Sequence, residues 1–104
     1  IRETPFPELE IDVSAGVVRL DRHRIELSAK EFGLLAYLHS RRGEVCSKDE
    51  IGFAVWPEYE GNVYDYQIEN LIHRLRQGLE YEPSDPQLVV TVRGLGYKLV
   101  VGGA

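Results

Sequence analysis

The sequence of 104 residues is poor in the features that mark disulfide-linked, membrane and metal-binding proteins. Its one cysteine, Cys46, cannot form an internal disulfide, which is typical of the reducing cytoplasm and predicts a cytoplasmic protein. The longest apolar run, residues 33–38, falls far short of the ~18 residues of a membrane span, so we expect no membrane insertion. The three histidines, His23, His39 and His73, show no metal-ligand spacing, and we expect no metal site.

The sequence also shows no set of residues typical of a catalytic site. Cys46 stands beside Ser47, a predicted helix cap, and we interpret it as a buried small residue rather than a nucleophile. The segment Gly94-Leu95-Gly96 is too short for a phosphate-binding loop. Because no base accompanies a nucleophile, a small hydrolase is the weakest hypothesis, and only a phosphate-sized pocket beside His73 would favour it. We expect no enzymatic activity and no cofactor.

Positive charge is scarce as well. The chain has 12 lysines and arginines against 17 aspartates and glutamates, and its net charge of −5 is a mild argument against nucleic-acid binding. The charge is unevenly distributed, because residues 1–61 carry a net charge of −4 and residues 62–104 only −1. Residues 86–104 contain two bases and no acid. A local basic surface can therefore exist on an acidic domain.

The chain is long enough for one domain, predicted over residues 8–101. Residues 1–7, with two prolines, are predicted to be the end of a linker, and residues 102–104 a C-terminal tail. Because the first residue is not Met, we expect a fragment of a longer protein. Three short segments alternate apolar and polar side chains between turns, as in an antiparallel meander: 9–12, 17–20 and 23–27.

Two capping boxes predict the next elements. Ser28-Ala-Lys-Glu31 begins a helix that is expected to end at Gly43. Ser47-Lys-Asp-Glu50 begins a second, shorter helix, which Pro57 stops. In both boxes the serine hydroxyl can accept from the glutamate amide while the glutamate reaches back to the serine amide. The segment 57–61 that follows is an acidic loop.

A third helix and a hairpin complete the predicted order β-β-β-α-α-α-β-β. Asn62 is a plausible N-cap for a helix over about residues 62–79. The apolar stripe of this helix lies within an arc of ~100° and consists of Ile68, Leu71, Ile72, Leu75 and Leu79. Residues 88–101 form two β-rich runs around Gly94-Leu95-Gly96, which predicts a hairpin.

This layout is that of a winged helix-turn-helix of the α+β class, in which the third helix can enter the major groove of DNA and the hairpin can lie on the minor groove. The side chains opposite the apolar stripe are hydrogen-bonding types: Tyr66, Asn70, His73 and Gln77, flanked by Gln67 and Arg74. Amides pair with adenine edges and arginine with guanine edges. A merely solvated helix face usually carries Glu and Lys, whereas this face has no Lys, so base reading is favoured over the solvated face.

Three segments resemble the OmpR/PhoB-type effector domains of bacterial response regulators. Val90-Thr-Val-Arg-Gly-Leu-Gly-Tyr-Lys-Leu99 is similar to the wing signature of that family. Ile72-His-Arg-Leu-Arg76, followed by Leu79-Glu80, is similar to the end of its recognition helix, and Leu27-Ser-Ala-Lys-Glu-Phe32 to the start of its first helix. The resemblance covers about residues 9–101 and implies an N-terminal antiparallel sheet, three helices and a C-terminal β-hairpin wing.

The resemblance also implies roles for individual residues. Base-facing positions correspond to Gln67, Asn70 and Arg74. Positions on or beside the DNA backbone correspond to Trp56, Tyr66, His73, Arg76, Thr91 and Tyr97. Arg93 corresponds to the wing arginine that enters the minor groove. The loop 57–61, with Glu58, Tyr59 and Glu60, corresponds to the segment that contacts RNA polymerase. The family frequently has basic residues where this chain has Tyr66 and His73.

The sequence therefore predicts a sequence-specific binder of double-stranded DNA, a bacterial transcription regulator that pairs on tandem sites in its full-length form. The alternative is a winged helix that serves as a protein-interaction module without binding DNA, and the net charge of −5 supports that alternative.

Overall fold

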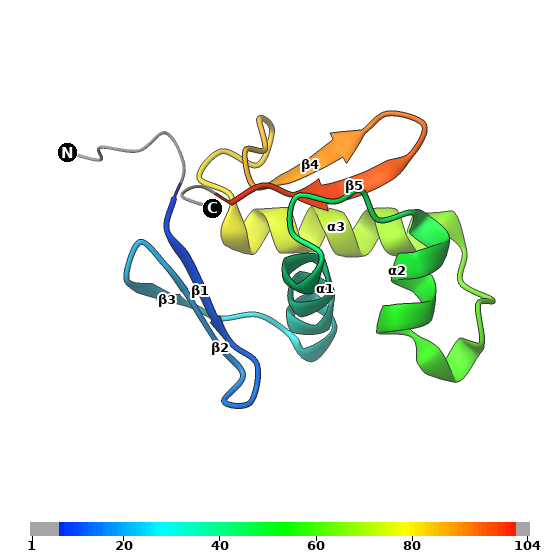
Figure 1. Ribbon diagram of the computed structural model, residues 1–104, viewed down its shortest axis with the longest axis horizontal. Helices are drawn as coiled ribbons and strands as arrows, with labels where there is room; N and C mark the ends of the chain where they lie inside the picture. The colour runs from blue at the N-terminus through cyan, green and yellow to red at the C-terminus, as the bar shows by residue number, and fades with distance from the viewer. Residues whose placement is uncertain (1–6, 102–104) are drawn as a thin grey trace.

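The computed structural model describes residues 7–101, so the predicted tail and all but the last residue of the predicted linker end lie outside the described residues. Three strands, three helices and a two-stranded hairpin follow one another in the predicted order, with one short 3₁₀ helix added (Figure 1). No helix in the described part of the chain is long and apolar enough to cross a membrane.

The N-terminal sheet is an antiparallel meander of β1 (Leu9–Asp12), β2 (Val17–Leu20) and β3 (His23–Ile25). Asp21 and Arg22 turn the chain between β2 and β3 with φ values of 49° and 72°. The apolar side chains of the strands pack against the domain core, and Val18 is fully buried. The third strand ends at Ile25, two residues before its predicted end.

Both predicted capping boxes are present. Helix α1 (Ala29–Ser40) begins after Ser28, and α2 (Lys48–Val55) begins after Ser47. In each box the serine Oγ accepts from the amide of the glutamate three residues on, and that glutamate accepts from the serine amide. Helix α1 ends at Ser40, before the predicted Gly43, which has a positive φ of 83° in the turn that follows.

The prediction that Asn62 caps the third helix is wrong, because α3 spans Asp65–Leu79 and its N-cap is Tyr64. Val63 belongs to the extended segment before the helix and packs against α2, where a Cβ on Gly52 would lie 3.3 Å from the Val63 Cβ. The Asn62 amide donates to the Tyr59 carbonyl oxygen at 2.9 Å, so Asn62 belongs to the preceding turn and not to the helix. The cap is closed by Gln67, whose Oε1 accepts from the Tyr64 amide at 3.0 Å.

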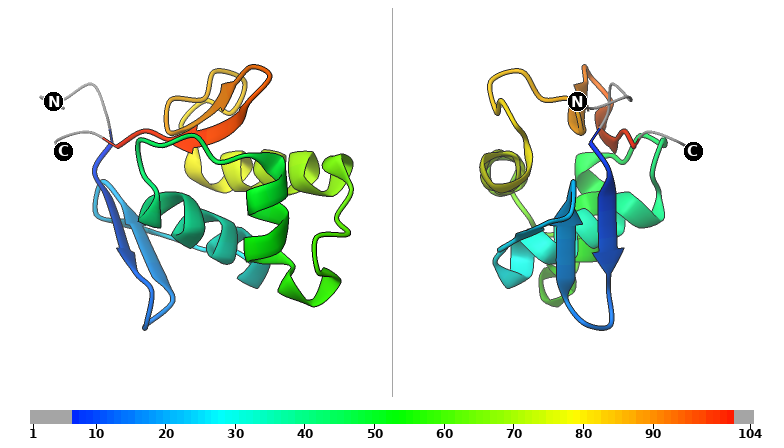
Figure 2. Two further views of the ribbon diagram at one scale, coloured as in Figure 1. Left: turned by 45° about the vertical axis from the view of Figure 1, so that its right-hand side comes forward. Right: turned by 90° about the vertical axis from the view of Figure 1, so that its left-hand side faces the viewer.

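The predicted apolar stripe of α3 is the centre of the core, and each of its five residues is at most 3% exposed. It packs against Leu34, Leu35 and Leu38 of α1 and against the hairpin of β4 (Val89–Val92) and β5 (Gly96–Leu99). The hairpin lies along α3, and Cys46, in the segment between α1 and α2, pairs with Tyr97 of β5 through two backbone hydrogen bonds of 2.7 and 2.9 Å (Figures 1 and 2). Burial of the stripe leaves the opposite face of α3 at the surface.

Candidate nucleic-acid interface

The outward face of α3 carries the predicted hydrogen-bonding side chains. When α3 is viewed end on, one side of it faces away from the rest of the domain (Figure 2, right). Its exposed polar residues include the predicted Tyr66, Asn70, His73, Arg74 and Gln77. This face can therefore approach a partner without any rearrangement of the core.

A surface hollow on one flank of α3, here called the tryptophan-side hollow, brings the three predicted base-reading residues together. Its lining is Lys30, Trp56, Tyr66, Gln67, Asn70, Leu71 and Arg74. Gln67 is only half-exposed and its carbonyl oxygen closes the helix cap, so its amide nitrogen is the group left for a ligand. Tyr66 stacks on Tyr64 with ring centroids 5.7 Å apart.

Lys30 belongs to this hollow although its sequence position within a capping box gave no sign of it. Its ammonium group donates to the Val55 carbonyl oxygen at 2.7 Å and to Glu58 Oε2 at 3.2 Å, and it lies 5.4 Å from the centre of the Trp56 ring. The Glu58 pKa is held below its ordinary value by the residue's own backbone amide and by Lys30. The first helix is thus linked to the loop that follows the second.

That loop contains a 3₁₀ turn, η1 (Pro57–Tyr59), and it presents the three residues predicted to contact RNA polymerase at the surface. Glu60 has a positive φ of 50°, and Tyr59 is 46% exposed. The loop lies at the α2 end of the molecule, at the lower right of Figure 1. Nothing in its geometry assigns it a partner.

Arg76 is engaged inside the protein. Its Nε donates to the Val89 carbonyl oxygen and its guanidinium also donates to Thr91 Oγ1, both at 2.9 Å, and the group lies 5.7 Å from the Tyr97 ring centre. Burial lowers the Arg76 pKa and raises the Tyr97 pKa, and Tyr97 is only 7% exposed. These contacts fasten the hairpin to α3, whereas Thr91 remains exposed. The predicted DNA contacts of Arg76 and Tyr97 remain predictions.

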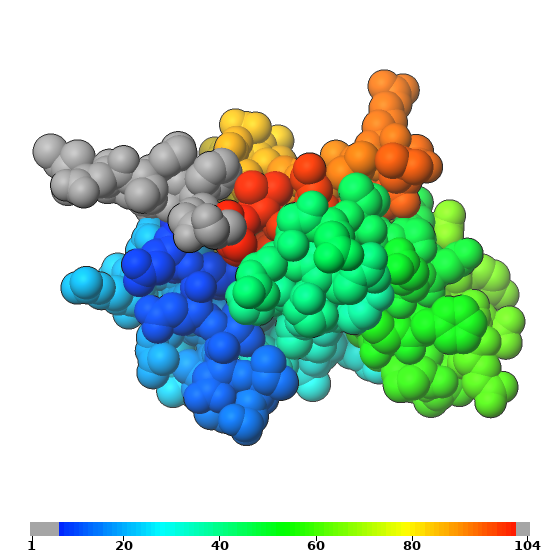
Figure 3. Space-filling model, viewed as in Figure 1, coloured from blue at the N-terminus to red at the C-terminus, as the bar shows by residue number. Residues whose placement is uncertain are grey.

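The tip of the hairpin projects from the body of the domain (Figure 3). Arg93, Gly94 and Leu95 are exposed there, and Gly94 has a φ of 79°. Within residues 7–101 the guanidinium groups of Arg93 and Arg74 make no hydrogen bond or ion pair. These two arginines are therefore among the cations that are free to bind an external anion or acceptor.

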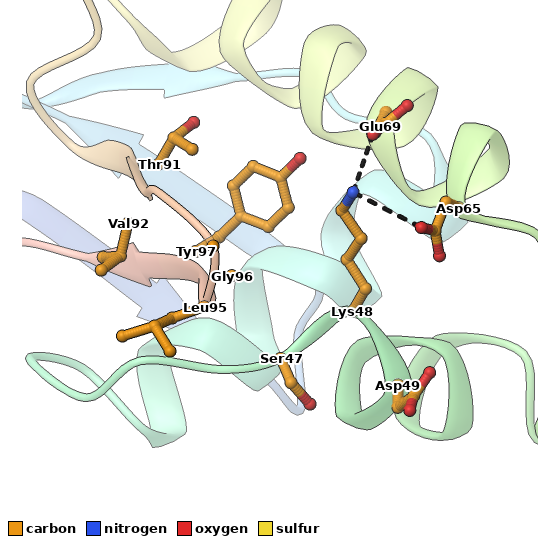
Figure 4. Close-up of a pocket in the computed structure, with 11 residues that line it drawn as sticks. Ser47, Lys48, Asp49, Asp65, Glu69, Thr91, Val92, Leu95, Gly96 and Tyr97 are labelled. Carbon is orange, nitrogen blue, oxygen red and sulfur yellow. Dashed lines mark hydrogen bonds and ion pairs between the residues drawn. The ribbon is translucent and has the colours of Figure 1, made fainter.

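A second hollow, here called the wing-side hollow, lies on the opposite flank of α3, between that helix and the hairpin (Figure 4). It is lined by Ser47, Lys48, Asp49, Asp65, Glu69, Thr91, Val92, Gly94, Leu95, Gly96 and Tyr97. Lys48 bonds Glu69 there at 2.8 Å. Lys48 could not be recognised as a site residue from the sequence, because its partners lie 17 and 21 residues further along the chain.

The three helices, the hairpin fastened to the third helix and the exposed polar face of that helix define a winged-helix domain. Comparison with known proteins then gives the family. The family described as transcriptional regulatory protein, C terminal, matches residues 22–99. The chain belongs to this family of transcription regulators, the OmpR/PhoB-type effector domains, and this confirms both the predicted family and the predicted fold.

Relatives and solved structures agree with this assignment. The chain is 39% identical over 92 residues to the sensory transduction protein RegX3 of Mycobacterium leprae, covering 88% of this chain and 46% of RegX3. It is 38% identical over 103 residues to the response regulator SaeR of Staphylococcus aureus, covering 94% and 42%. The chain thus spans less than half the length of these relatives.

Two structures illustrate the likeness in three dimensions. The response regulator DrrB of Thermotoga maritima, an OmpR/PhoB homolog, superposes with a TM-score of 0.80 at 30% identity, covering 93% of this chain and 43% of DrrB. The RstA DNA-binding domain of Klebsiella pneumoniae, solved in complex with the RstA box, superposes with a TM-score of 0.78 at 27% identity, covering 93% and 95%.

Proposed function

We propose that this domain binds double-stranded DNA sequence-specifically, with α3 in the major groove and the β4–β5 hairpin on the adjacent minor groove. The observation that carries the proposal is the exposed polar face of α3, whose Asn70 and Arg74 line one hollow together with Gln67. Asn and Gln pair with adenine and Arg with guanine in the major groove. The RstA domain, of similar fold, was solved with its DNA box, which supports the same use of this fold here.

We also infer that the domain is the effector part of a longer bacterial response regulator, as the lengths of RegX3 and SaeR suggest. In that protein two effector domains would bind tandem sites, since one acidic domain supplies few phosphate contacts. The loop with Glu58, Tyr59 and Glu60 is proposed to contact RNA polymerase, which rests on the family resemblance and on the exposure of the loop.

A selection experiment tests the central proposal. The 104-residue chain is incubated at low salt with a random pool of DNA duplexes, and the bound fraction is sequenced. We expect a defined motif, and a band-shift titration should show that excess nonspecific DNA does not displace it. If the chain enriches no sequence and binds no duplex at low salt, the domain is instead a protein-interaction module.

The first prediction concerns Arg74, which is exposed, has no hydrogen bond or ion pair within residues 7–101 and lines the same hollow as Asn70. Arg74→Ala should weaken binding to the selected motif by about 1–3 kcal/mol and relax the preference at one base pair. Titration of a panel of single-base variants measures both effects. Arg19→Ala, which removes the same charge from the exposed face of the N-terminal sheet, is the matched control and should leave the base preferences intact. A uniform loss of affinity without a change in preference would make Arg74 a phosphate contact.

The second prediction concerns Arg93 at the tip of the hairpin. Arg93 is exposed and has no hydrogen bond or ion pair within residues 7–101, so Arg93→Ala should change the free energy of unfolding by less than about 0.5 kcal/mol. A narrow minor groove attracts such a cation without base-specific bonds. Binding should therefore weaken most on motifs with an A·T-rich flank, measured against the same motif with a G·C-rich flank. Equal weakening on both flanks would reduce Arg93 to a phosphate contact, and a large loss of thermal stability would make it structural.

The third prediction concerns salt. Lys30, Lys48 and Arg76 are held by protein acceptors, so few cations of a single domain can neutralise phosphates. With about 0.9 counterions released per phosphate, a plot of log affinity against log salt should have a slope of about −2 to −4 per domain. Band shifts between low and physiological salt measure it on a single half-site. A slope near −8 for a monomer would show that the internally held cations leave their partners to reach DNA.

A further inference from the structure

The wing-side hollow is acidic, although it lies between the two elements that the proposed function brings to DNA. Three carboxylates line it, those of Asp49, Asp65 and Glu69, and Lys48 is its one lysine or arginine (Figure 4). On the opposite flank, the tryptophan-side hollow contains Lys30 and Arg74 and no carboxylate. The two flanks of α3 therefore favour different chemical groups.

Lys48 and Glu69 form the closest contact in the wing-side hollow. The Lys48 ammonium lies 2.8 Å from Glu69 Oε2 and 3.7 Å from Asp65 Oδ2. The hydrogen bond with Glu69 raises the Lys48 pKa, so the lysine stays charged. The Glu69 side chain is 52% exposed, and within residues 7–101 its second oxygen, Oε1, has no hydrogen-bond donor. One carboxylate oxygen is thus fixed by the lysine and the other is open to a ligand.

A DNA phosphate is a poor ligand for this hollow, because three carboxylates outnumber the single lysine. A base edge with an amino group is a better one. Cytosine presents its N4 amino donor in the major groove without a neighbouring acceptor, whereas adenine places N7 beside its amino group, and guanine and thymine present oxygen acceptors. A carboxylate that accepts from cytosine N4 is a recognised base contact. Glu69 directly precedes Asn70, which lies on the outward face of α3.

We propose that Glu69 reads a cytosine in the major groove and that Lys48 is the residue that positions its carboxylate. The lysine fixes Oε2 and offsets the negative charge, which leaves Oε1 free for cytosine N4. This inference rests on the proposed function and adds a base-reading residue on the side of α3 that faces the wing. The consensus motif should therefore contain a cytosine preferred about tenfold at a position that Arg74 does not read.

The test is DNA selection from a random pool with the wild-type chain, Glu69→Gln and Asp65→Asn. Both variants remove one negative charge from the same hollow, but only the first changes the proposed base contact. Glutamine pairs with adenine, so Glu69→Gln should replace the cytosine preference by adenine at one position and leave the other positions unchanged. Asp65→Asn should keep the cytosine. Thermal unfolding of both variants, expected to match wild type, checks that the fold is intact.

Two outcomes would overturn the inference while leaving the DNA-binding function in place. In the first, Glu69→Gln enriches the wild-type motif at every position, whether or not affinity rises. In the second, Asp65→Asn alters the same position to the same extent, which would make the effect one of charge alone. If the wild-type chain enriches no motif, the proposed function itself fails, which is a different result from either.

Discussion

Replacing Glu80 with alanine is expected to lower the free energy of unfolding by about 3–4 kcal/mol, a large part of the 5–15 kcal/mol typical of a small domain. Glu80 follows α3 and is the one buried polar or charged residue among residues 7–101. Its carboxylate accepts from three successive backbone amides, those of Gln87, Leu88 and Val89, at distances between 2.6 and 3.1 Å. We call this contact of the carboxylate with the three amides the Glu80 clamp. Without it, the amides of Leu88 and Val89 are left buried and unpaired.

Urea unfolding of Glu80→Ala, Glu80→Gln and Glu82→Ala measures this effect. Glutamine keeps one acceptor oxygen but turns its NH2 group toward a backbone amide. The free energy of unfolding of Glu80→Gln should therefore fall between those of wild type and Glu80→Ala. Glu82→Ala is the matched control, because Glu82 is an exposed glutamate of the same loop, and within residues 7–101 its side chain bonds only Ser84 Oγ. It should change stability by less than about 0.5 kcal/mol. Equal losses for Glu80→Ala and Glu82→Ala would show that the clamp is not needed.

The clamp also shows why a sequence motif can be visible while its physical role is not. The pair Leu79-Glu80 supported the family resemblance, but the sequence gives no indication that this carboxylate is buried. Its amide partners lie seven to nine residues ahead, in a loop whose path depends on the packing of the hairpin against α3. The apolar stripe and the two capping boxes could be predicted because each depends on spacings of three or four residues.

The start of α3 and the function of Arg76 illustrate the same limit at the site. Asn62 is a good capping residue by type, but its own amide donates to the Tyr59 carbonyl oxygen in the preceding turn, and the helix begins at Asp65. Arg76 was predicted to contact DNA because it corresponds to a position of the family on or beside the DNA backbone, and that contact stays a prediction. Its two acceptors belong to the hairpin, 13 and 15 residues along the chain, and their approach cannot be read from the helix alone.

The residues predicted to read bases were easier to place together from the sequence than the cations around them. Gln67, Asn70 and Arg74 belong to one helix, so helical geometry alone places them on one flank, and the structure does bring them to one hollow. Lys30 and Lys48 reach α3 from other helices, and their contacts span between 17 and 28 residues. Periodicity within one element cannot reveal such contacts, which is why the wing-side hollow was missed.

Substitution of Gly96 is expected to be as damaging as loss of the Glu80 clamp, because Gly96 has both a special backbone conformation and no space for a side chain. Its φ is 147°, in the region that favours glycine. A Cβ there would overlap the Cys46 carbonyl oxygen and lie 3.0 Å from the Ser47 Cα, and both are backbone atoms. The Cys46 carbonyl accepts from the Tyr97 amide at 2.9 Å, so relief of the overlap breaks the pairing that docks the hairpin.

Gly96→Ala should therefore cost about 3 kcal/mol or more, from backbone strain of about 1–3 kcal/mol plus the lost hydrogen bonds. Gly94→Ala is the matched control, since Gly94 also has a positive φ, of 79°, but no atom within 4 Å of its added Cβ. Its cost should be about 1–2 kcal/mol, the penalty of a left-handed alanine alone. Urea unfolding measures both, and amide hydrogen exchange at Tyr97 should rise in the Gly96 variant only.

If the hairpin positions Arg93, DNA binding by Gly96→Ala should weaken most on A·T-rich flanks, as for Arg93→Ala, whereas Gly94→Ala should bind like wild type. Equal losses of stability in the two glycine variants would show that φ alone, and not the contact with Cys46, demands glycine at position 96.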